Sequence, residues 1–483
     1  MSEQSLKHKT TVGVFWSFIE RFSVQLIQLV LGIVLARLLL PSDFGLIGML
    51  TVFIAVSGLF IDSGFPNALI QKKNRTEKDF STVFYFNILI SLLCYILLYI
   101  SAPFISAFYH TPELISIIRI LFLNLIINSF ATVQNVKLRI ALNFKKKAVI
   151  NLTSIIISGG IGILMAYAGS GVWALVAQTL SNSLITLILL QILVKWKPLL
   201  VFSKSSFNQL FNFGSKLLGA AFIDAVMDNL YSILIGRYFS SAQVGYYNRG
   251  LQMPTVVSGT VSSTLESVVY PVMTSVQDDR KLLLSIYRRL IRVVSFLIIP
   301  AMIGLVIISE PFVRYFLTEK WMPAVILMQW MCFARIFSPI NLLNISLLNA
   351  VGRSDLFLKI NLSKLPIAII TLIITIPMGV KAVVIGHFIN SIIGFFVNAY
   401  MPGKLFGYGA MAQMKDMLRS FFCSGPMAIV LFLLSNMIHQ DLIKIIACII
   451  VGGGIYYFLA LFFKMDEIGE LNIILKKIWR KVK

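Results

Sequence analysis

Ten ionisable side chains stand inside segments of this sequence that are otherwise strongly apolar. Five are acidic and five are basic: Glu20, Arg21, Asp62, Arg119, Asp224, Asp228, Arg249, Glu266, Arg335 and Lys364. Each charge costs roughly 2.5–3.5 kcal/mol near the centre of a membrane helix, so exposing all ten to lipid would cost on the order of 25 kcal/mol. The charged groups must therefore face one another or a hydrated interior. Such groups often mark the pathways of substrates and ions.

Polar residues at a spacing of four form stripes in both halves of the chain. The stripes are Asn124 with Asn128, Asp224 with Asp228, and Ser258 with Ser262 and Glu266. Residues four apart lie on the same face of a helix. The simplest construction therefore has two helical bundles that turn polar faces toward a common central cavity.

A structural role is the alternative for these charges. The two aspartates of the second half would pair with Arg249 or Lys364 and lock that half, since buried charges are usually paired. Glu20 and Arg21 would form an ordinary ion pair at the end of the first helix. The sequence leaves both alternatives open.

The composition is that of an integral membrane protein. Of the 483 residues, 58% are hydrophobic and 13% are charged, and the mean hydropathy is +0.87, outside the range of soluble globular proteins. The four cysteines, at positions 94, 332, 423 and 448, stand singly in apolar segments, which predicts packing roles and neither disulfides nor a metal site. No Walker A loop is visible, and no cofactor is expected.

The apolar segments predict an all-α polytopic membrane protein. A hydrocarbon core of about 30 Å needs about 20 apolar residues per helix. Fourteen spans are expected on this basis, near residues 13–36, 44–67, 81–101, 114–136, 148–168, 172–194, 213–237, 245–272, 290–309, 325–350, 357–378, 380–400, 419–438 and 441–463. The count falls to twelve if one of the weaker pairs lies on the membrane surface.

The two halves repeat each other at an interval of about 205 residues. Arg37 stands eight residues before Gly45, and Arg237 stands eight before Gly245, each in a turn between two predicted helices. The repeat predicts one six-helix bundle at 1–203, a second at 204–403, and two additional helices with a basic tail at 404–483. Repeated bundles in a membrane chain usually enclose a cavity in which a solute binds and changes sides, so the repeat points to transport.

Lysine and arginine fall mostly on one side of this topology. Of the 42, 31 lie at the termini and in alternate loops, 6 in the remaining loops and 5 inside spans. Because cytoplasmic loops retain positive charge, both termini are predicted to be cytoplasmic. This distribution accounts for the net charge of +22 without a nucleic-acid partner, since no loop is long enough to form a basic soluble domain.

Two segments outside the spans are predicted to lie along the membrane surface. Phe207, Leu210 and Phe211 connect the two halves, and residues 468–482 combine regularly spaced apolar residues with lysine and arginine. This pattern is typical of interfacial helices. For the connecting segment a solvated linker is the alternative, because its periodicity covers little more than one turn.

Several motifs resemble bacterial polysaccharide exporters. They are the region of Trp16 and Arg21, the Leu-Pro-Ser-Asp-Phe-Gly turn at 40–45, Asp-Ser-Gly-Phe at 62–65 and Gly-Val-Trp-Ala-Leu-Val at 171–176. More narrowly, the chain resembles the Wzx-type O-antigen and colanic-acid flippases of the multidrug/oligosaccharidyl-lipid/polysaccharide superfamily. The resemblance extends over essentially the whole chain.

The resemblance implies a transporter and not an enzyme. It would flip undecaprenyl-pyrophosphate-linked oligosaccharide repeat units from the cytoplasmic to the periplasmic leaflet of the bacterial inner membrane. A diphosphate with an attached sugar cannot cross about 30 Å of hydrocarbon unaided, whereas its prenyl tail can stay in lipid. The expected partners are the lipid-linked oligosaccharide, membrane lipids and polysaccharide assembly proteins, with H⁺ or Na⁺ as the coupling ion.

The resemblance also suggests roles for the polar residues. Arginine suits phosphate because its planar group donates two hydrogen bonds and stays charged. The expected headgroup contacts are Arg249, Arg335, Lys364, Arg21 and Arg119. The expected sugar contacts are Asn124, Asn128, Ser258 and Ser262. The acids that would hold these cations in position or take up the coupling ion are Asp62, Asp224, Asp228, Glu266 and Glu20.

Other function classes remain as alternatives. A cation-coupled multidrug exporter or a peptidoglycan-precursor flippase of the same superfamily would also carry buried charges, and five acids against five bases do not decide between them. A membrane enzyme would need a long catalytic loop or a paired histidine and acid within the membrane. A purely structural scaffold would not need ten charges in its helices.

Overall fold

The structure is a computed structural model, and it describes residues 3–62, 65–72 and 74–469. The side chains of Arg21, Asp62, Asp224 and Glu266 lie outside the described set, as does the predicted interfacial tail from residue 470 onward. Every regular element in the described ranges is a helix. The predicted all-α fold class is confirmed.

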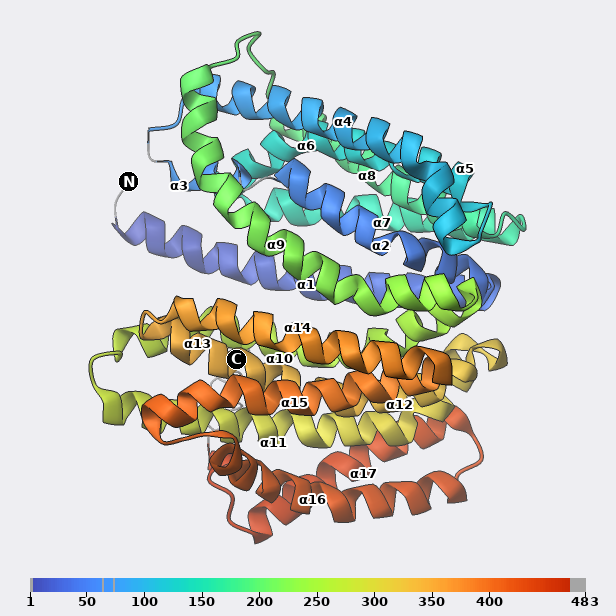
Figure 1. The fold of residues 1–483 in the computed structure, drawn as a ribbon, viewed down its shortest axis with the longest axis vertical. Helices are drawn as coiled ribbons and strands as arrows, with labels where there is room; N and C mark the ends of the chain where they lie inside the picture. The colour runs from blue at the N-terminus through green and yellow to red at the C-terminus, as the bar shows by residue number, and fades with distance from the viewer. Residues whose placement is uncertain (1–2, 63–64, 73, 470–483) are drawn as a thin grey trace. The chain divides into compact units, whose positions relative to one another are not determined.

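The chain forms two compact units, Met1–Gly245 and Tyr246–Lys483, called here unit 1 and unit 2. Unit 1 holds α1 (Glu3–Leu38), α2 (Pro41–Asp62), α3 (Phe65–Gln71), α4 (Glu77–Tyr109), α5 (Leu114–Leu121), α6 (Leu123–Ile140), α7 (Phe144–Tyr167), α8 (Val172–Val194) and α9 (Lys204–Tyr238) (Figure 1). Helix α10 (Ser241–Ser275) begins in unit 1 and continues into unit 2.

Unit 2 holds the remaining helices. They are α11 (Arg280–Phe312), α12 (Pro323–Arg335), α13 (Phe337–Ala350), α14 (Ser354–Thr375), α15 (Val380–Phe406), α16 (Ala410–Met437) and α17 (Asp441–Phe462), with a π-helical turn at Val313–Leu317 and 3₁₀ turns at Glu319–Trp321 and Ile376–Met378. The predicted boundaries at residues 203 and 403 describe the sequence repeat and stay a prediction.

Eleven of the described helices, or pairs of consecutive helices, are long and apolar enough to cross a membrane. Two of these spans join two α-helices, α5 with α6 and α12 with α13, and two others join α11 and α14 to the short helical turn that follows each. Helices α1, α9 and α10 occupy the three other predicted spans, and α1 contains a shorter apolar segment, Phe22–Leu38. A polytopic membrane protein is therefore confirmed, while the count of fourteen spans stays a prediction.

The segment expected to lie on the membrane surface is the first part of α9. Leu210 is buried in a cluster with Phe65 of α3 and Phe84 of α4. The Phe207 ring stacks on that of Phe65, with centroids 5.9 Å apart. The apolar side chains of this segment pack against α3 and α4, and its position on the membrane surface stays a prediction. Unit 1 consequently extends past residue 203.

The chain between α8 and α9, residues 195–203, is fastened to the start of α4. The backbone N–H of Leu199 donates to Oγ of Ser81 at 2.9 Å, and that of Ser203 donates to Oγ1 of Thr82 at 3.0 Å. Trp196 also donates its indole N–H to α4, at Glu77. The connector is therefore part of the packed structure of unit 1.

The repeated turn brings the starts of α2 and α10 into backbone contact. A Cβ atom at Gly45 would lie 1.7 Å from the carbonyl oxygen of Ser241, and one at Gly245 would lie 2.0 Å from that of Pro41. Only glycine permits such an approach. The two glycines that mark the sequence repeat thus meet each other in a reciprocal contact.

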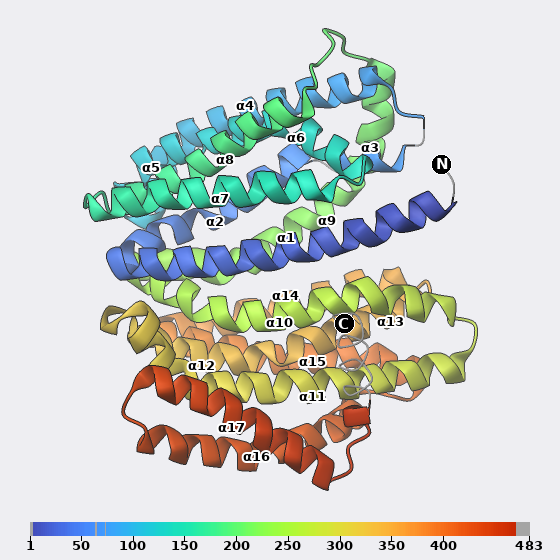
Figure 2. The same ribbon diagram turned by 180° about the vertical axis from the view of Figure 1, so that it is seen from behind.

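Helix α7 lies between α1 and α8 in unit 1 (Figure 2). Small residues allow close packing on both sides: Gly159 faces Leu31 of α1, and Gly162 faces Gln178 of α8. Asn143 caps the first turn of α7, since its side chain accepts a hydrogen bond from the backbone N–H of Lys146. This arrangement fixes the face of α7 that carries the site described below.

In unit 2, α16 and α17 pack against α11. A buried polar network ties α16 to α11 and α13: Gln413 donates to Tyr287 Oη and to Asn344 Oδ1, both at 2.9 Å. Arg288 of α11 binds both carboxylate oxygens of Asp416, at 2.7 and 3.0 Å. The additional C-terminal helix pair is therefore fixed to unit 2 by specific polar contacts as well as by apolar packing.

Candidate functional site

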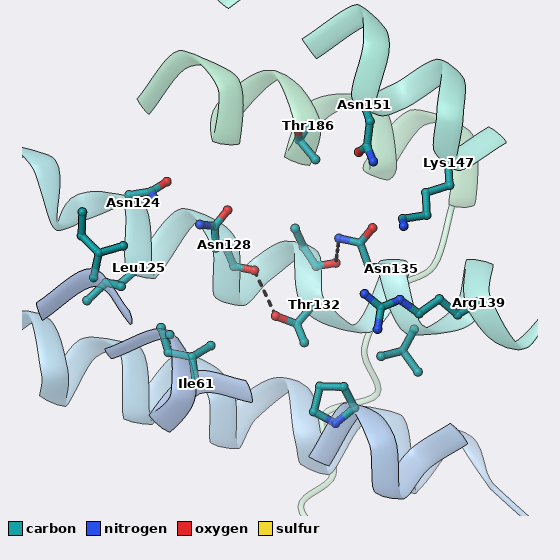
Figure 3. Close-up of a pocket in the computed structure, with 15 residues that line it drawn as sticks. Ile61, Asn124, Leu125, Asn128, Thr132, Asn135, Arg139, Lys147, Asn151 and Thr186 are labelled. Atoms are coloured by element: carbon teal, nitrogen blue, oxygen red, sulfur yellow. Dashed lines mark hydrogen bonds between the residues drawn. The ribbon is translucent and has the colours of Figure 1, made fainter. Parts of the chain in front are cut away.

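Unit 1 contains a cavity of about 520 Å³ between α2, α3, α6, α7 and α8 (Figure 3). Its lining residues are Ile54, Gly58, Ile61, Pro66, Asn124, Leu125, Asn128, Ala131, Thr132, Asn135, Val136, Arg139, Lys147, Asn151 and Thr186. The volume lies within the roughly 300–1,000 Å³ typical of small-molecule sites. Eight of the fifteen lining residues carry polar side chains.

One face of α6 supplies most of these polar groups. Asn124, Asn128, Thr132, Asn135 and Arg139 follow one another at intervals of three or four residues, which aligns them along the helix. Thr132 donates to the carbonyl oxygen of Asn128 at 3.1 Å, and Asn135 donates to that of Ala131 at 3.2 Å. The cavity therefore has a row of amide and hydroxyl groups along one wall.

The end of the cavity next to the α6–α7 turn is basic. Arg139 of α6 and Lys147 of α7 point into the same space as the amide of Asn135 (Figure 3). The charge count predicts that this turn is cytoplasmic. Two cations from neighbouring helices form a suitable site for an anion such as a phosphate.

Glu20 of α1 lies next to Lys147 at this basic end. This residue is 6% exposed. Lys147 Nζ lies 3.2 Å from Glu20 Oε1, and Asn151 Nδ2 donates to the same oxygen at 2.6 Å. Glu20 thus binds one cation and one amide, and the formal charge of Glu20, Lys147 and Arg139 together is positive.

The arrangement suits binding of a ligand that carries both phosphate and hydroxyl groups. The cations provide charge-assisted hydrogen bonds to phosphate oxygens, and the amides can donate to and accept from hydroxyls. No group of three or more metal-ligating side chains occurs among the described residues. These features indicate a binding site for a polar, anionic ligand.

Three of the predicted site residues belong to this cavity or border it. Asn124 and Asn128 line it, and Glu20 pairs with one of its cations. Arg119 lies elsewhere in unit 1, on α5, where its guanidinium carbon is 4.5 Å from the centre of the Tyr99 ring. The individual roles assigned to these residues stay predictions.

The remaining described candidates of unit 2 have contacts of their own. Arg249 donates to Gln252 at 2.6 Å and stacks on Trp321, while Lys364 donates to Asn398 at 3.2 Å. Arg335 has a buried Nε without a hydrogen-bond partner in the part of unit 2 that is described.

Three further candidates also lie outside the unit 1 cavity. Ser258 on α10 is buried, Ser262 on the same helix is half-buried, and Asp228 on α9 is exposed. The cavity is lined by residues of unit 1 alone.

The sequence reasoning missed six polar residues of the cavity: Thr132, Asn135, Arg139, Lys147, Asn151 and Thr186. Arg139 and Lys147 were counted as loop charges because they lie near the predicted cytoplasmic turn. The signal was present, since the spacing that relates Asn124 to Asn128 continues to residues 132, 135 and 139. Extending the stripe to the end of the helix would have identified Thr132, Asn135 and Arg139.

Comparisons with known proteins identify the family. A model described as "Polysaccharide biosynthesis protein" matches residues 34–326. The teichuronic acid biosynthesis protein TuaB of Bacillus subtilis (strain 168) is 25% identical over 89% of each chain. The lipopolysaccharide biosynthesis protein WzxC of Escherichia coli (strain K12) is 24% identical over 91% of this chain and 90% of that protein.

A solved structure shares the fold. The lipid II flippase MurJ in an inward closed conformation superimposes with a TM-score of 0.76 at 17% sequence identity, covering 94% of this chain and 100% of that one. The resemblance to Wzx-type polysaccharide flippases is confirmed by the family match and the relatives. The family model covers more than half of the sequence and includes every residue of the unit 1 cavity. The chain belongs to the polysaccharide biosynthesis protein family.

Proposed function

We propose that this protein flips an undecaprenyl-pyrophosphate-linked oligosaccharide repeat unit from the cytoplasmic to the periplasmic leaflet of the bacterial inner membrane. The observation that carries the proposal is the unit 1 cavity, where two cations and a row of amides lie together between apolar helices. Family membership supplies the chemical context, which is polysaccharide biosynthesis. The protein acts as a transporter and catalyses no covalent step.

The two ends of the ligand match the two parts of the cavity. Arg139 and Lys147 receive the diphosphate at the end predicted to be cytoplasmic, where the headgroup enters. Asn124, Asn128 and Asn135 exchange hydrogen bonds with sugar hydroxyls deeper along α6. The prenyl tail stays in lipid throughout, so only the polar headgroup requires a hydrated path.

Glu20 is the candidate for ion coupling in this scheme. When Glu20 is ionised, it neutralises Lys147 from 3.2 Å. Uptake of a proton or a sodium ion would weaken that pair and leave Lys147 available to the diphosphate. Association with polysaccharide assembly proteins would then deliver the flipped unit to polymerisation.

Deletion of the gene tests the proposal. We expect complete lipid-linked repeat units to accumulate on the inner leaflet and surface polymer to be lost, with both restored by the wild-type gene. Lipid extraction followed by mass spectrometry measures the intermediates. Normal surface polymer with increased sensitivity to drugs or dyes would instead indicate a multidrug exporter, and accumulation of peptidoglycan precursor would indicate a peptidoglycan-precursor flippase.

A further inference from the structure

Unit 2 contains a second polar cavity, of about 460 Å³, at the ends of α11, α12, α16 and α17. Its lining residues are Val306, Ile307, Glu310, Pro311, Arg314, Ile326, Gln329, Trp330, Phe333, Phe432, Ser435, Asn436 and Lys444. The charge count predicts that these helix ends face the periplasm. Neither the repeat nor the intramembrane charges pointed to this site.

The interior of this outer pocket combines aromatic rings with neutral polar groups. The Trp330 ring is held by Phe333 and Phe388, with centroids 6.1 and 5.6 Å away. Gln329 is also fixed, because its amide donates to Ser309 Oγ at 3.1 Å. Together with Ser435 and Asn436, the pocket presents an indole, two amides and a hydroxyl.

The charges at the rim of the outer pocket balance one another. Arg314 lies 2.5 Å from Glu310 and 3.6 Å from Asp441. Lys444 contributes a second positive charge, so two acids stand against two bases. Arg314 belongs to a π-helical turn, a distortion that is frequent at functional sites. Because the formal charges cancel, this rim is less suited to a phosphate than the basic end of the unit 1 cavity is.

We propose that the outer pocket binds a neutral sugar of the oligosaccharide on the periplasmic side, an inference that rests on the proposed function. A pyranose ring has an apolar face that packs on an indole, and its hydroxyls bond to amide and hydroxyl side chains. The pocket provides both kinds of group in a volume within the usual range for small ligands. It would hold the sugar end of the flipped molecule before release.

A binding measurement tests the inference. The full chain is purified into nanodiscs of phosphatidylglycerol, and the probe is a set of labelled oligosaccharide fragments cut from the host's own surface polysaccharide. We expect saturable binding that weakens more than tenfold in Trp330→Ala and about tenfold in Asn436→Ala. Trp330→Phe keeps an aromatic ring and should retain most of the affinity, which separates loss of the site from misfolding.

The matched control is Trp173→Ala. Trp173 is a half-buried tryptophan at the start of α8 in unit 1, where the chain is also predicted to face the periplasm. This variant should bind the fragments as the wild type does. Binding that is unchanged in Trp330→Ala overturns the inference, and so does equal loss in Trp173→Ala.

A zwitterionic lipid headgroup is the other ligand that a rim with both acids and bases could bind. A competition experiment distinguishes it from the sugar. Displacement of the fragments by glycerophosphoethanolamine would show that the pocket is a lipid site and would overturn the inference. Fragment binding does not depend on transport. If the fragments do not bind, the pocket inference fails, but the result of the gene deletion still tests the proposed function. The deletion strain could instead make normal surface polymer while the fragments still bind through Trp330. That result would contradict the proposed function and support a glycan-binding pocket.

Discussion

At the scale of single residues, Arg139 and Lys147 differ in how their charge is balanced. Lys147 lies beside the buried carboxylate of Glu20, whereas Arg139 extends from α6 into the cavity (Figure 3) and forms no ion pair with any of the described residues. Arginine can bind a diphosphate through two parallel hydrogen bonds. We therefore expect Arg139 to carry the larger share of phosphate binding.

Arg139→Ala should reduce headgroup transfer by tenfold or more at normal protein abundance, because a hydrogen bond to a charged group contributes about 1.5–3 kcal/mol. Transfer of labelled lipid-linked oligosaccharide in proteoliposomes measures the rate. Lys146→Ala is the control, since Lys146 is exposed on the same helical hairpin and does not line the cavity. An equal reduction in both variants would mean that total charge, and not this contact, is what matters.

Glu20→Gln separates structural pairing from ion coupling. The change removes the negative charge beside Lys147 while preserving the shape of the side chain, and we expect a loss of about 1–3 kcal/mol in stability. If Glu20 also takes up the coupling ion, transfer driven by an ion gradient disappears while exchange without a gradient continues. Thermal unfolding and gradient-driven transfer are measured together. Glu113→Gln, at an exposed acid before α5, should change neither quantity.

At the scale of elements, the contact between Gly45 and Gly245 sets how closely α2 and α10 approach at their starts. Gly45→Ala places a methyl group 1.7 Å from a backbone oxygen, so the helices must separate. We expect a loss of about 1–3 kcal/mol, the usual result of overpacking. The thermal midpoint of the purified protein reports it.

Gly259→Ala is the matched control for that experiment. Gly259 lies on α10 with no atom within 4 Å of a Cβ built there. Alanine favours helix by up to about 1 kcal/mol, so this variant should be as stable as the wild type or more stable. Similar destabilisation in both variants would contradict the special role of the contact.

Most element positions could be predicted from the sequence because apolar runs of membrane length are a strong signal. The repeat of Arg37–Gly45 in Arg237–Gly245 also predicted a turn in each half. It did not predict that the two turns are in contact. Two local features escaped prediction. The span near 114–136 is divided at Phe122 into α5 and α6, and α9 begins at Lys204 because its first turns find apolar partners on α3 and α4. The packing at the start of α9 depends on contacts between segments far apart in the sequence.

At the scale of the whole molecule, the charge distribution predicts which end of each helix is cytoplasmic. Helix α7 offers a direct test because exposed residues flank it: Lys145 at its start and Ala168 after its end. In a background without native cysteines, Ala168→Cys should react with an impermeant thiol reagent in intact cells. Lys145→Cys should react only after the cells are permeabilised. The reverse pattern would invert the topology and place the basic end of the cavity outside.

The candidate site could be predicted only in part. Asn124 and Asn128 were found because they form a polar stripe in an apolar span, and both line the unit 1 cavity. Arg139 was missed because the stripe was not followed to the end of its helix. Lys147 was missed because charge near a helix end is normally solvated, and the sequence does not show which loop charges turn inward. The pairing of Glu20 with Asn151 joins residues 131 positions apart, which no local pattern can reveal.

The fastening of residues 195–203 to α4 has a consequence for how the gene can be divided. Leu200 is 94% exposed at the middle of this segment, while hydrogen bonds hold Leu199 and Ser203 on either side of it. A second fragment beginning at Val201 would carry the whole of α9, whose packing surface belongs to α2, α3 and α4. Co-expressed polypeptides 1–200 and 201–483 should therefore co-purify and restore surface polymer in the deletion strain. The protein would then function as two separately encoded fragments.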